Sequence, residues 1–277
     1  MFKETVNMFK KNRVFFLFTV LMILLLTACG SNEQDSAEDN SNSSADSEAK
    51  LIISAAASLT DALEEIKTAF NKENPDISIT YNFGGSGNLS QQIQQGAPTD
   101  IFLSASKKDM DTISEKTLID EDSRFDFVQN QLVVITEKSN TLKLPAIEDL
   151  ATIDIGNLAM GDVEAVPAGR YGKASLENSG VWDNIENKVV YFSDVRQVLT
   201  QVETGNAELG IVYRTDAIQS DKVKIIHDID SSLHDPIIYP AAIIKDSQNK
   251  EAATKYLDFL KSEKGKEILQ SYGFITN

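Results

Sequence analysis

The 277-residue sequence has one cysteine, two histidines and fewer basic than acidic residues, 26 against 42. The single cysteine excludes a disulfide framework and a cysteine-rich metal site. The acidic balance, without a cluster of lysine or arginine in the folded part, argues against nucleic acid as a partner. The apolar run at residues 14–28 has 15 residues. As a helix it would span about 22 Å, which is too short for a bilayer core of about 30 Å.

Basic residues precede this run at Lys10, Lys11 and Arg13, a pattern typical of an export signal rather than of a membrane anchor. The run ends in LTAC, which resembles the lipobox of bacterial lipoproteins, where cleavage occurs before the cysteine and lipid is attached to it. We therefore expect residues 1–28 to be a lipoprotein signal peptide and Cys29 to carry the lipid; an ordinary buried cysteine is the alternative. Removing residues 1–28 takes away four basic residues and one acidic residue, so the net charge falls from −16 to −19.

The segment SNEQDSAEDNSNSSADSEAK, residues 31–50, has no aliphatic residue larger than alanine and cannot form a core. Together with the lipidated cysteine, residues 29–50 are therefore predicted to be a flexible polar tether. As a flexible coil such a segment has a root-mean-square span of about 25 Å. The domain after this tether is expected outside the cytoplasm, held at the cell membrane.

From Leu51 onward, strand-like and helix-like segments alternate, which predicts an α/β fold with parallel sheets. The length of the folded part favours two lobes over one oversized sheet. We expect residues 51–130 and 237–277 to form the first lobe and residues 131–236 the second. This division depends on QLVVITE and PIIYPAAII, which look like paired crossover strands.

Small or hydroxyl residues occupy four strand-to-helix turns: SAAASLTDAL around Ser58, NFGGSGNLS around Ser86, AVPAGRYGK around Ala168, and YFSDVRQVL around residues 193–195. Each turn would present unpaired backbone N–H groups at the positive end of a helix. In open α/β sheets such turns gather at the carboxyl ends of the strands, so together they predict an anion site. The alternative for each serine is a plain helix N-cap, with Asp61 completing a capping box after Ser58.

Three known motifs do not fit the glycine-rich turn. A phosphate-binding P-loop needs a lysine after the turn, and a dinucleotide fingerprint needs glycine where Ser90 stands. A hydrolase nucleophile elbow would place glycine at Asn88. His227 or His234 could still complete a Ser-Asp-His order, so a serine-dependent hydrolase stays open as the less favoured alternative.

Five segments in order resemble the signature segments of the molybdate-binding proteins of bacterial ABC importers: AAASLTDAL, GGSGNLSQQIQQGAPTDIFLSA, GDVEAVPAGRYGKASL, SDVRQVL and LGIVYRTDA. The likeness covers residues 51–274. It implies a two-lobed periplasmic-binding-protein-like fold with the ligand in a cleft between the lobes. Carried over to this sequence, the residues that hold the oxyanion are Ser58, Ser86, Ala168, Val195 and Tyr213. Val163 departs from the family pattern, in which many relatives have proline, but it precedes the ligand turn.

The resemblance implies a receptor that captures molybdate, and also tungstate, and delivers it to an ABC permease and its ATPase. Such a receptor is expected to be a monomer that uses no cofactor and performs no catalysis. The only metal expected in it is that of the bound molybdate oxyanion, held by the ligand-binding residues. A receptor for another oxyanion such as sulfate is the alternative. Tyr213 at the end of an apolar stretch could also be a plain core residue. Arg170 and Arg196 flank the expected site, and we favour ion pairs with surface carboxylates over direct contact with the anion.

Overall fold

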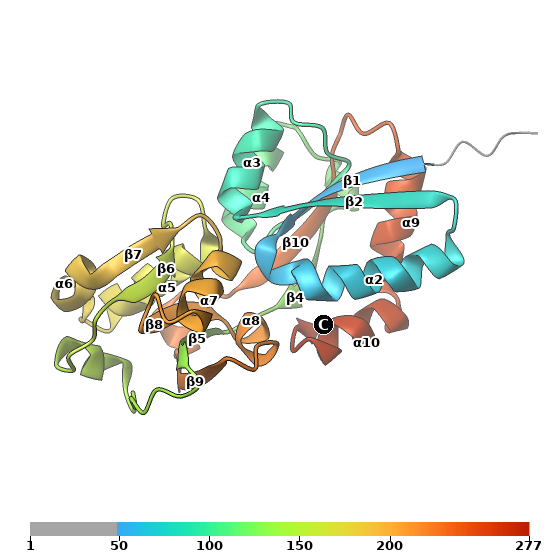
Figure 1. Ribbon diagram of the computed structural model, residues 1–277. Helices are drawn as coiled ribbons and strands as arrows, with labels where there is room; N and C mark the ends of the chain where they lie inside the picture. Colours follow the sequence, from blue (N-terminus) through green and yellow to red (C-terminus); the bar gives the residue numbers. More distant parts are fainter. Residues whose placement is uncertain (1–48, 277) are drawn as a thin grey trace, which may run out of the picture. The chain divides into compact units, whose positions relative to one another are not determined.

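The computed structural model describes residues 49–276. The predicted signal peptide, Cys29 and all of the tether before residue 49 lie outside the described residues. Within the described part of the chain, no helix is long and apolar enough to cross a membrane. The expected α/β class is confirmed, because strands and helices alternate along the chain. The strands form two β-sheets, and helices cover them (Figure 1).

The first sheet has six strands, and we call the part of the chain around it lobe 1. In spatial order the strands are β11 (Ile275–Thr276), β4 (Phe125–Gln129), β10 (Ile238–Ile243), β3 (Ile101–Leu103), β1 (Ala49–Ala56) and β2 (Ile77–Gly84). Its helices are η1 (Ala57–Leu59), α2 (Thr60–Glu73), α3 (Ser86–Gln94), α4 (Lys107–Ser114), η2 (Glu121–Ser123), α9 (Lys250–Lys261) and α10 (Glu263–Ser271).

The second sheet has five strands, and the part of the chain around it is lobe 2. In spatial order the strands are β7 (Val189–Phe192), β6 (Leu158–Gly161), β8 (Leu209–Tyr213), β5 (Leu132–Glu137) and β9 (Val223–Asp228). Its helices are η3 (Ile147–Ala151), α5 (Pro167–Asn178), α6 (Trp182–Ile185), η4 (Glu186–Lys188), α7 (Val195–Glu203), α8 (Arg214–Ile218) and η5 (Ser231–Leu233).

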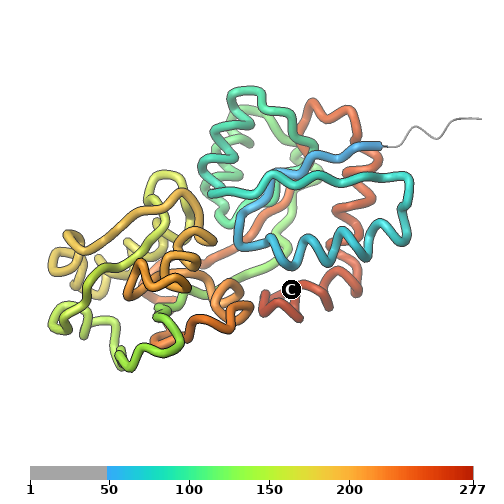
Figure 2. Tube along the Cα trace, viewed as in Figure 1, coloured from blue at the N-terminus to red at the C-terminus, as the bar shows by residue number. Residues whose placement is uncertain are grey.

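The chain crosses from lobe 1 to lobe 2 between β4 and β5 and returns between β9 and β10 (Figure 2). Lobe 1 is therefore built from both ends of the described chain, and lobe 2 from its middle. We propose the lobe boundaries that the sequence suggested, residues 51–130 with 237–277 and residues 131–236. The distribution of the strands between the two sheets supports this proposal.

The expectation of parallel sheets holds for only part of each sheet. β1 runs parallel to β2 and β3, and β6 parallel to β7 and β8, but β10 is antiparallel to β3 and β4, and β5 to β8 and β9. The reason is the double crossover. A strand that enters a lobe from the junction starts where the parallel strands end, so it must run in the opposite direction. β5 and β10, the two segments that the sequence suggested as crossover strands, are the first strands after the two crossings, and each enters a different sheet.

Both faces of the first sheet are covered by helices. In β3, Ile101 and Leu103 belong to the main apolar core, whereas Phe102 belongs to a second cluster with Leu89 of α3 and Met110 of α4. On the main-core face, α2 and α9 meet where the ring of Phe70 packs edge-on against two aromatic rings, those of Tyr256 and Phe259. This burial holds β1 and β3 rigid, and the turns after these strands are thereby fixed in position.

Candidate ligand-binding site

A small cavity lies where helices of both lobes begin. Its lining includes Ser58 and Ser86 from lobe 1 and Val195 and Tyr213 from lobe 2. Ala168 directly follows Pro167, which also lines the cavity. The structure thus brings the turns of all five sequence-predicted residues to one place. That these residues contact a ligand stays a prediction.

Ser58 lies in η1, between β1 and α2, and is buried. The expectation that it caps a helix is wrong: the residue before α2 is Leu59, and no side chain caps this helix. Instead Ser58 Oγ lies 2.9 Å from the hydroxyl of Tyr239. A short 3₁₀ turn ahead of α2 moves the helix start one residue along the chain, from Leu59 to Thr60. That turn leaves the Ser58 hydroxyl at the cavity.

Ser86 is the first residue of α3 and is completely buried. Gly85 stands in the N-cap position, so Ser86 is not the cap either. Its Oγ accepts a hydrogen bond from the backbone N–H of Ala105 at 2.9 Å. A hydroxyl that has accepted this bond still has its own proton to donate. Ser86 can therefore offer a hydrogen-bond donor to a ligand in the cavity.

The glycines on either side of Ser86 let the two lobes approach closely. A Cβ atom at Gly85 would lie 2.8 Å from the carbonyl oxygen of Ser193, and one at Gly87 would lie 2.8 Å from that of Ala165. The Gly87 N–H also donates to the Ala165 carbonyl across the lobes, at 2.9 Å. The glycine-rich turn is therefore a packing surface between lobes as well as a part of the cavity. Sequence reasoning missed this second role.

Two helix N-termini of lobe 2 reach the cavity. Helix α5 begins at Pro167 with Ala168 second, and α7 begins at Val195. Asp194 caps α7, since its side chain accepts the N–H of Gln197 at 2.9 Å. The first N–H groups of any helix have no acceptor within the helix. Ala168 and Val195 can therefore supply backbone donors, although neither side chain has a polar atom.

Tyr213 ends β8 and is 1% exposed. Its ring packs edge-on against Tyr239 with the centroids 5.9 Å apart, so it does belong to the core. Its hydroxyl, however, has no hydrogen-bond partner among the described residues, and Tyr213 lines the cavity. Burial raises the pKa of the phenol well above its ordinary value, which keeps the proton in place. An unpaired buried donor is costly, and an anion in the cavity would satisfy it.

Arg170 and Arg196 pair with carboxylates, as we favoured, but their partners are not ordinary surface groups. Arg170 pairs with Asp109 of lobe 1, which is 6% exposed. Arg196 lies 2.9 Å from Asp61 of lobe 1, measured from Nη1 to Oδ2. Both pairs therefore join the two lobes, and the donors left at the cavity are neutral hydroxyl and N–H groups.

Asp216, three residues after Tyr213 in α8, is a buried carboxylate. Its nearest cation is Arg196, whose Nη1 lies 3.6 Å from Oδ1, and neither carboxylate oxygen has a hydrogen-bond partner among the described residues. Burial raises the pKa of Asp216 to about 7; Arg196 opposes this shift and Asp61 adds to it. The protonation of this group is therefore sensitive to pH near neutrality.

The histidines lie away from the cavity. His227 belongs to β9, and its Nδ1 is 3.2 Å from the carbonyl oxygen of Leu144. His234 packs beside Tyr171, with its Nδ1 2.7 Å from the carbonyl oxygen of Asp235. Neither lines the cavity that holds Ser86, so the hydrolase alternative gains no support from this arrangement.

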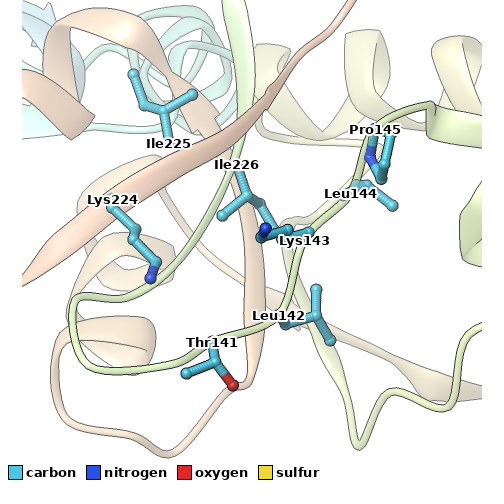
Figure 3. A pocket seen from close by; sticks show the side chains of 8 residues that line it. All are labelled: Thr141, Leu142, Lys143, Leu144, Pro145, Lys224, Ile225 and Ile226. Carbon is cyan, nitrogen blue, oxygen red and sulfur yellow. The ribbon is translucent and has the colours of Figure 1, made fainter.

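A wider and more open groove lies between residues 141–145 and β9 in lobe 2 (Figure 3). Its lining is mostly aliphatic, with two lysines, Lys143 and Lys224. Lys224 already donates to the carbonyl oxygen of Asn140. An open apolar groove does not replace the hydration shell of a small anion, so the cavity between the lobes is the better candidate.

Comparison with known proteins agrees with this geometry. Residues 51–275 match the family model described as bacterial extracellular solute-binding protein. The chain belongs to this family. It is a family of solute-binding receptors, not of enzymes, which fits a cavity built from donors without an adjacent base.

Named relatives cover most of the chain. YvgL of Bacillus subtilis (strain 168), named as a candidate ABC transporter substrate-binding lipoprotein, is 39% identical over 96% of this chain and 99% of its own length. The molybdate-binding protein ModA of Escherichia coli (strain K12) is 38% identical, covering 82% of this chain and 89% of its own.

A solved structure, the substrate-binding domain of a candidate molybdenum ABC transporter from Clostridium difficile, is 39% identical with a TM-score of 0.65, and covers 83% of this chain and 99% of its own. The periplasmic molybdate-binding protein of Azotobacter vinelandii shares the fold with a TM-score of 0.75 at 24% identity over 82% of this chain and 99% of its own. The resemblance seen in the sequence is thereby confirmed at the level of family and two-lobed fold.

Proposed function

We propose that this protein is an extracytoplasmic receptor that captures molybdate, and also tungstate, and delivers it to the permease and ATPase of an ABC importer. The observation that carries the proposal is the cavity between the lobes. Tyr213, whose hydroxyl has no hydrogen-bond partner among the described residues, lines this cavity together with Ser58, Ser86 and the first residues of α5 and α7. The names of the relatives support the choice of ligand.

The chemistry of the ligand suits this set of donors. Molybdate is a fully deprotonated tetrahedral dianion at neutral pH, so it accepts hydrogen bonds on all sides and offers none. A hydrogen bond to a charged group contributes about 1.5–3 kcal/mol, so several of them offset the loss of hydration and give submicromolar affinity. Because both nearby arginines are paired with carboxylates, the site works through dipoles rather than a full positive charge.

The same donors disfavour phosphate. Phosphate keeps at least one proton near neutral pH, and the lining of the cavity includes no carboxylate to accept that proton. Sulfate has the correct charge but is smaller than molybdate, so it would leave some donors without a partner.

The proposed attachment to the membrane depends on Cys29. YvgL is named as a lipoprotein, and the LTAC sequence of this chain supports the same arrangement. Replacing Cys29 by serine is expected to leave the precursor uncleaved and free of labelled fatty acid. Incorporation of label into the Cys29→Ser protein would contradict the lipid anchor without affecting the proposal for the ligand.

The ligand proposal is tested by titrating residues 29–277, with Cys29→Ser, against molybdate, tungstate, sulfate, phosphate and citrate. Trp182 and the tyrosines provide intrinsic fluorescence that reports binding. We expect molybdate and tungstate to bind at least about tenfold more tightly than sulfate, a difference of about 1.4 kcal/mol, and far more tightly than phosphate. Equal affinity for molybdate and phosphate would contradict the proposal, and tighter binding of sulfate would favour a sulfate receptor.

A further inference from the structure

A chain of buried polar side chains runs from the junction of the two lobes to the cavity. Asn130, between β4 and β5, donates from Nδ2 to Thr215 Oγ1 at 2.9 Å and to the Tyr239 hydroxyl at 3.2 Å. The Tyr239 hydroxyl in turn lies 2.9 Å from Ser58 Oγ. All four side chains are buried, and Tyr239 is 0% exposed. The role inferred for this chain rests on the proposed function, because it concerns the ligand of that same cavity.

The direction of the hydrogen bonds in this chain is set at Asn130. Its Oδ1 accepts the backbone N–H of Gln131 at 2.9 Å. A backbone N–H can only donate, so the atom facing it must be the amide oxygen, and the NH₂ group must face Thr215 and Tyr239. Asn130 is therefore a donor toward Tyr239.

The donor direction at Asn130 also determines which group donates between Tyr239 and Ser58. Burial raises the pKa of the Tyr239 phenol, so the group keeps its single proton. Since its oxygen accepts from Asn130, the proton is satisfied by donation to Ser58 Oγ, its other hydrogen-bond partner among the described residues. Ser58 then accepts from Tyr239, and its own proton is left to point at the ligand.

We propose that Asn130 and Tyr239 are positioning residues that fix the Ser58 hydroxyl as a donor and thereby help to reject anions that carry a proton. Without the Asn130 amide as donor, Ser58 could donate its proton to the Tyr239 hydroxyl and accept a hydrogen bond from a protonated ligand. The discrimination between molybdate and hydrogen phosphate then depends in part on two residues that do not line the cavity.

The decisive variant is Asn130→Asp. A carboxylate at position 130 still accepts the Gln131 N–H, but it accepts from Tyr239 where the amide donated. Tyr239 would then accept from Ser58, and Ser58 would face the ligand as an acceptor. At about pH 8.5 molybdate and hydrogen phosphate are both dianions that differ by one proton, so repulsion by the added charge weakens both alike and cancels in the ratio of their affinities.

We expect Asn130→Asp to lower the molybdate-to-phosphate affinity ratio at least about tenfold, measured by titration calorimetry with molybdate and by phosphate competition. This change corresponds to about 1.4 kcal/mol. The matched control is Asn184→Asp, which adds the same charge at an exposed position on α6 and should leave the ratio unchanged. Equal weakening of both ligands in Asn130→Asp would overturn the proposal.

Tyr239→Phe keeps the ring and adds no charge, so it tests the same idea if Asn130→Asp folds poorly. Ser58 then loses the group that orients it, and the affinity ratio should fall about threefold or more, since one weak orienting bond is lost. An unchanged ratio in a folded Tyr239→Phe protein would contradict the proposal. If the wild-type protein bound no molybdate at all, the proposed function would fail, and this outcome is distinct from the other two.

Discussion

Lobe 1 and lobe 2 supply the cavity with donors of different kinds. In lobe 1 the donors are the hydroxyls of Ser58 and Ser86, each with its oxygen in contact with a neighbouring polar group. In lobe 2 they are backbone N–H groups at the starts of α5 and α7, together with the unpaired hydroxyl of Tyr213. The donors of lobe 1 can be recognised in the sequence because serine is a polar residue type. Ala168 and Val195 have apolar side chains and can donate only through backbone N–H groups at the starts of their helices.

The backbone contribution of lobe 2 is tested most severely by Val195→Pro. Proline is well suited to the first position of a helix, and Asp194 before it has the extended backbone that a following proline requires. The change removes the Val195 N–H and places a ring where the anion would lie, so we expect molybdate affinity to fall by more than about a hundredfold.

Val195→Ala is the matched control for that variant, because it removes the side chain but keeps the N–H. Its molybdate affinity should stay within a few-fold of wild type. Similar affinities for Val195→Pro and Val195→Ala in calorimetric titrations would show that lobe 2 does not bind through this backbone group.

Tyr213→Phe tests the one side-chain donor of lobe 2. The ring and its contact with Tyr239 remain, and only the unpaired hydroxyl is lost. We expect molybdate affinity to fall by about 1.5–3 kcal/mol, mainly through faster dissociation, with the thermal stability of the free protein unchanged or higher. Stopped-flow release of molybdate measures this; identical off-rates and affinities would make Tyr213 a core residue only.

Ser86→Ala sharpens the comparison because its hydroxyl serves two partners. We expect molybdate affinity to fall about tenfold, the lower end of the range for a hydrogen bond to a charged group. The free protein should also lose about 1–3 kcal/mol of stability, since the buried Ala105 N–H is left without its acceptor. Calorimetric unfolding and titration of the same sample separate the two effects. A loss of stability with unchanged molybdate affinity would mean that Ser86 has only a structural role.

Asp216 gives the stability of lobe 2 a dependence on pH near neutrality. Its pKa in the folded protein is about 7, above its ordinary value of 3.8, so the folded state holds a proton that the unfolded state releases between these values. The stabilisation is complete below about pH 4 and is lost as the pH rises through about 7. Between about pH 5 and pH 8 the melting temperature of wild type should therefore fall by a few degrees more than that of Asp216→Asn. Parallel melting curves against pH would contradict a pKa near 7 for Asp216.

The smallest effect is expected at an ion pair that joins the lobes. Asp61→Asn weakens the pairing with Arg196, and half-exposed pairs of this kind contribute about 0–1 kcal/mol. Molybdate affinity should fall less than about fivefold, and less still at high salt, because the pair is partly screened. A large, salt-independent loss would mean that Asp61 or Arg196 contacts the ligand directly.

The sequence was sufficient for the α/β class and for the family, since periodicity and five ordered segments carry that information. It was not sufficient for the direction of β5 and β10, because strand direction depends on where the chain crosses between lobes. Nor could it assign Ser58, because a serine before a helix has the same pattern whether it caps the helix or turns to Tyr239. The sequence also could not predict the hydrogen bonds that link Asn130, Tyr239 and Ser58. Ser58 and Tyr239 are 181 positions apart and come into contact only in the folded protein.

The central claim is that an oxyanion lies between the lobes, held by donors of both kinds. Anomalous X-ray diffraction at the molybdenum edge from crystals grown with molybdate tests it most directly. We predict one strong molybdenum peak in the cavity, with its oxygen atoms within hydrogen-bonding distance of the hydroxyls of Ser58, Ser86 and Tyr213 and of the N–H groups of Ala168 and Val195. A peak in the open groove between residues 141–145 and β9, or no peak at all, would contradict the account.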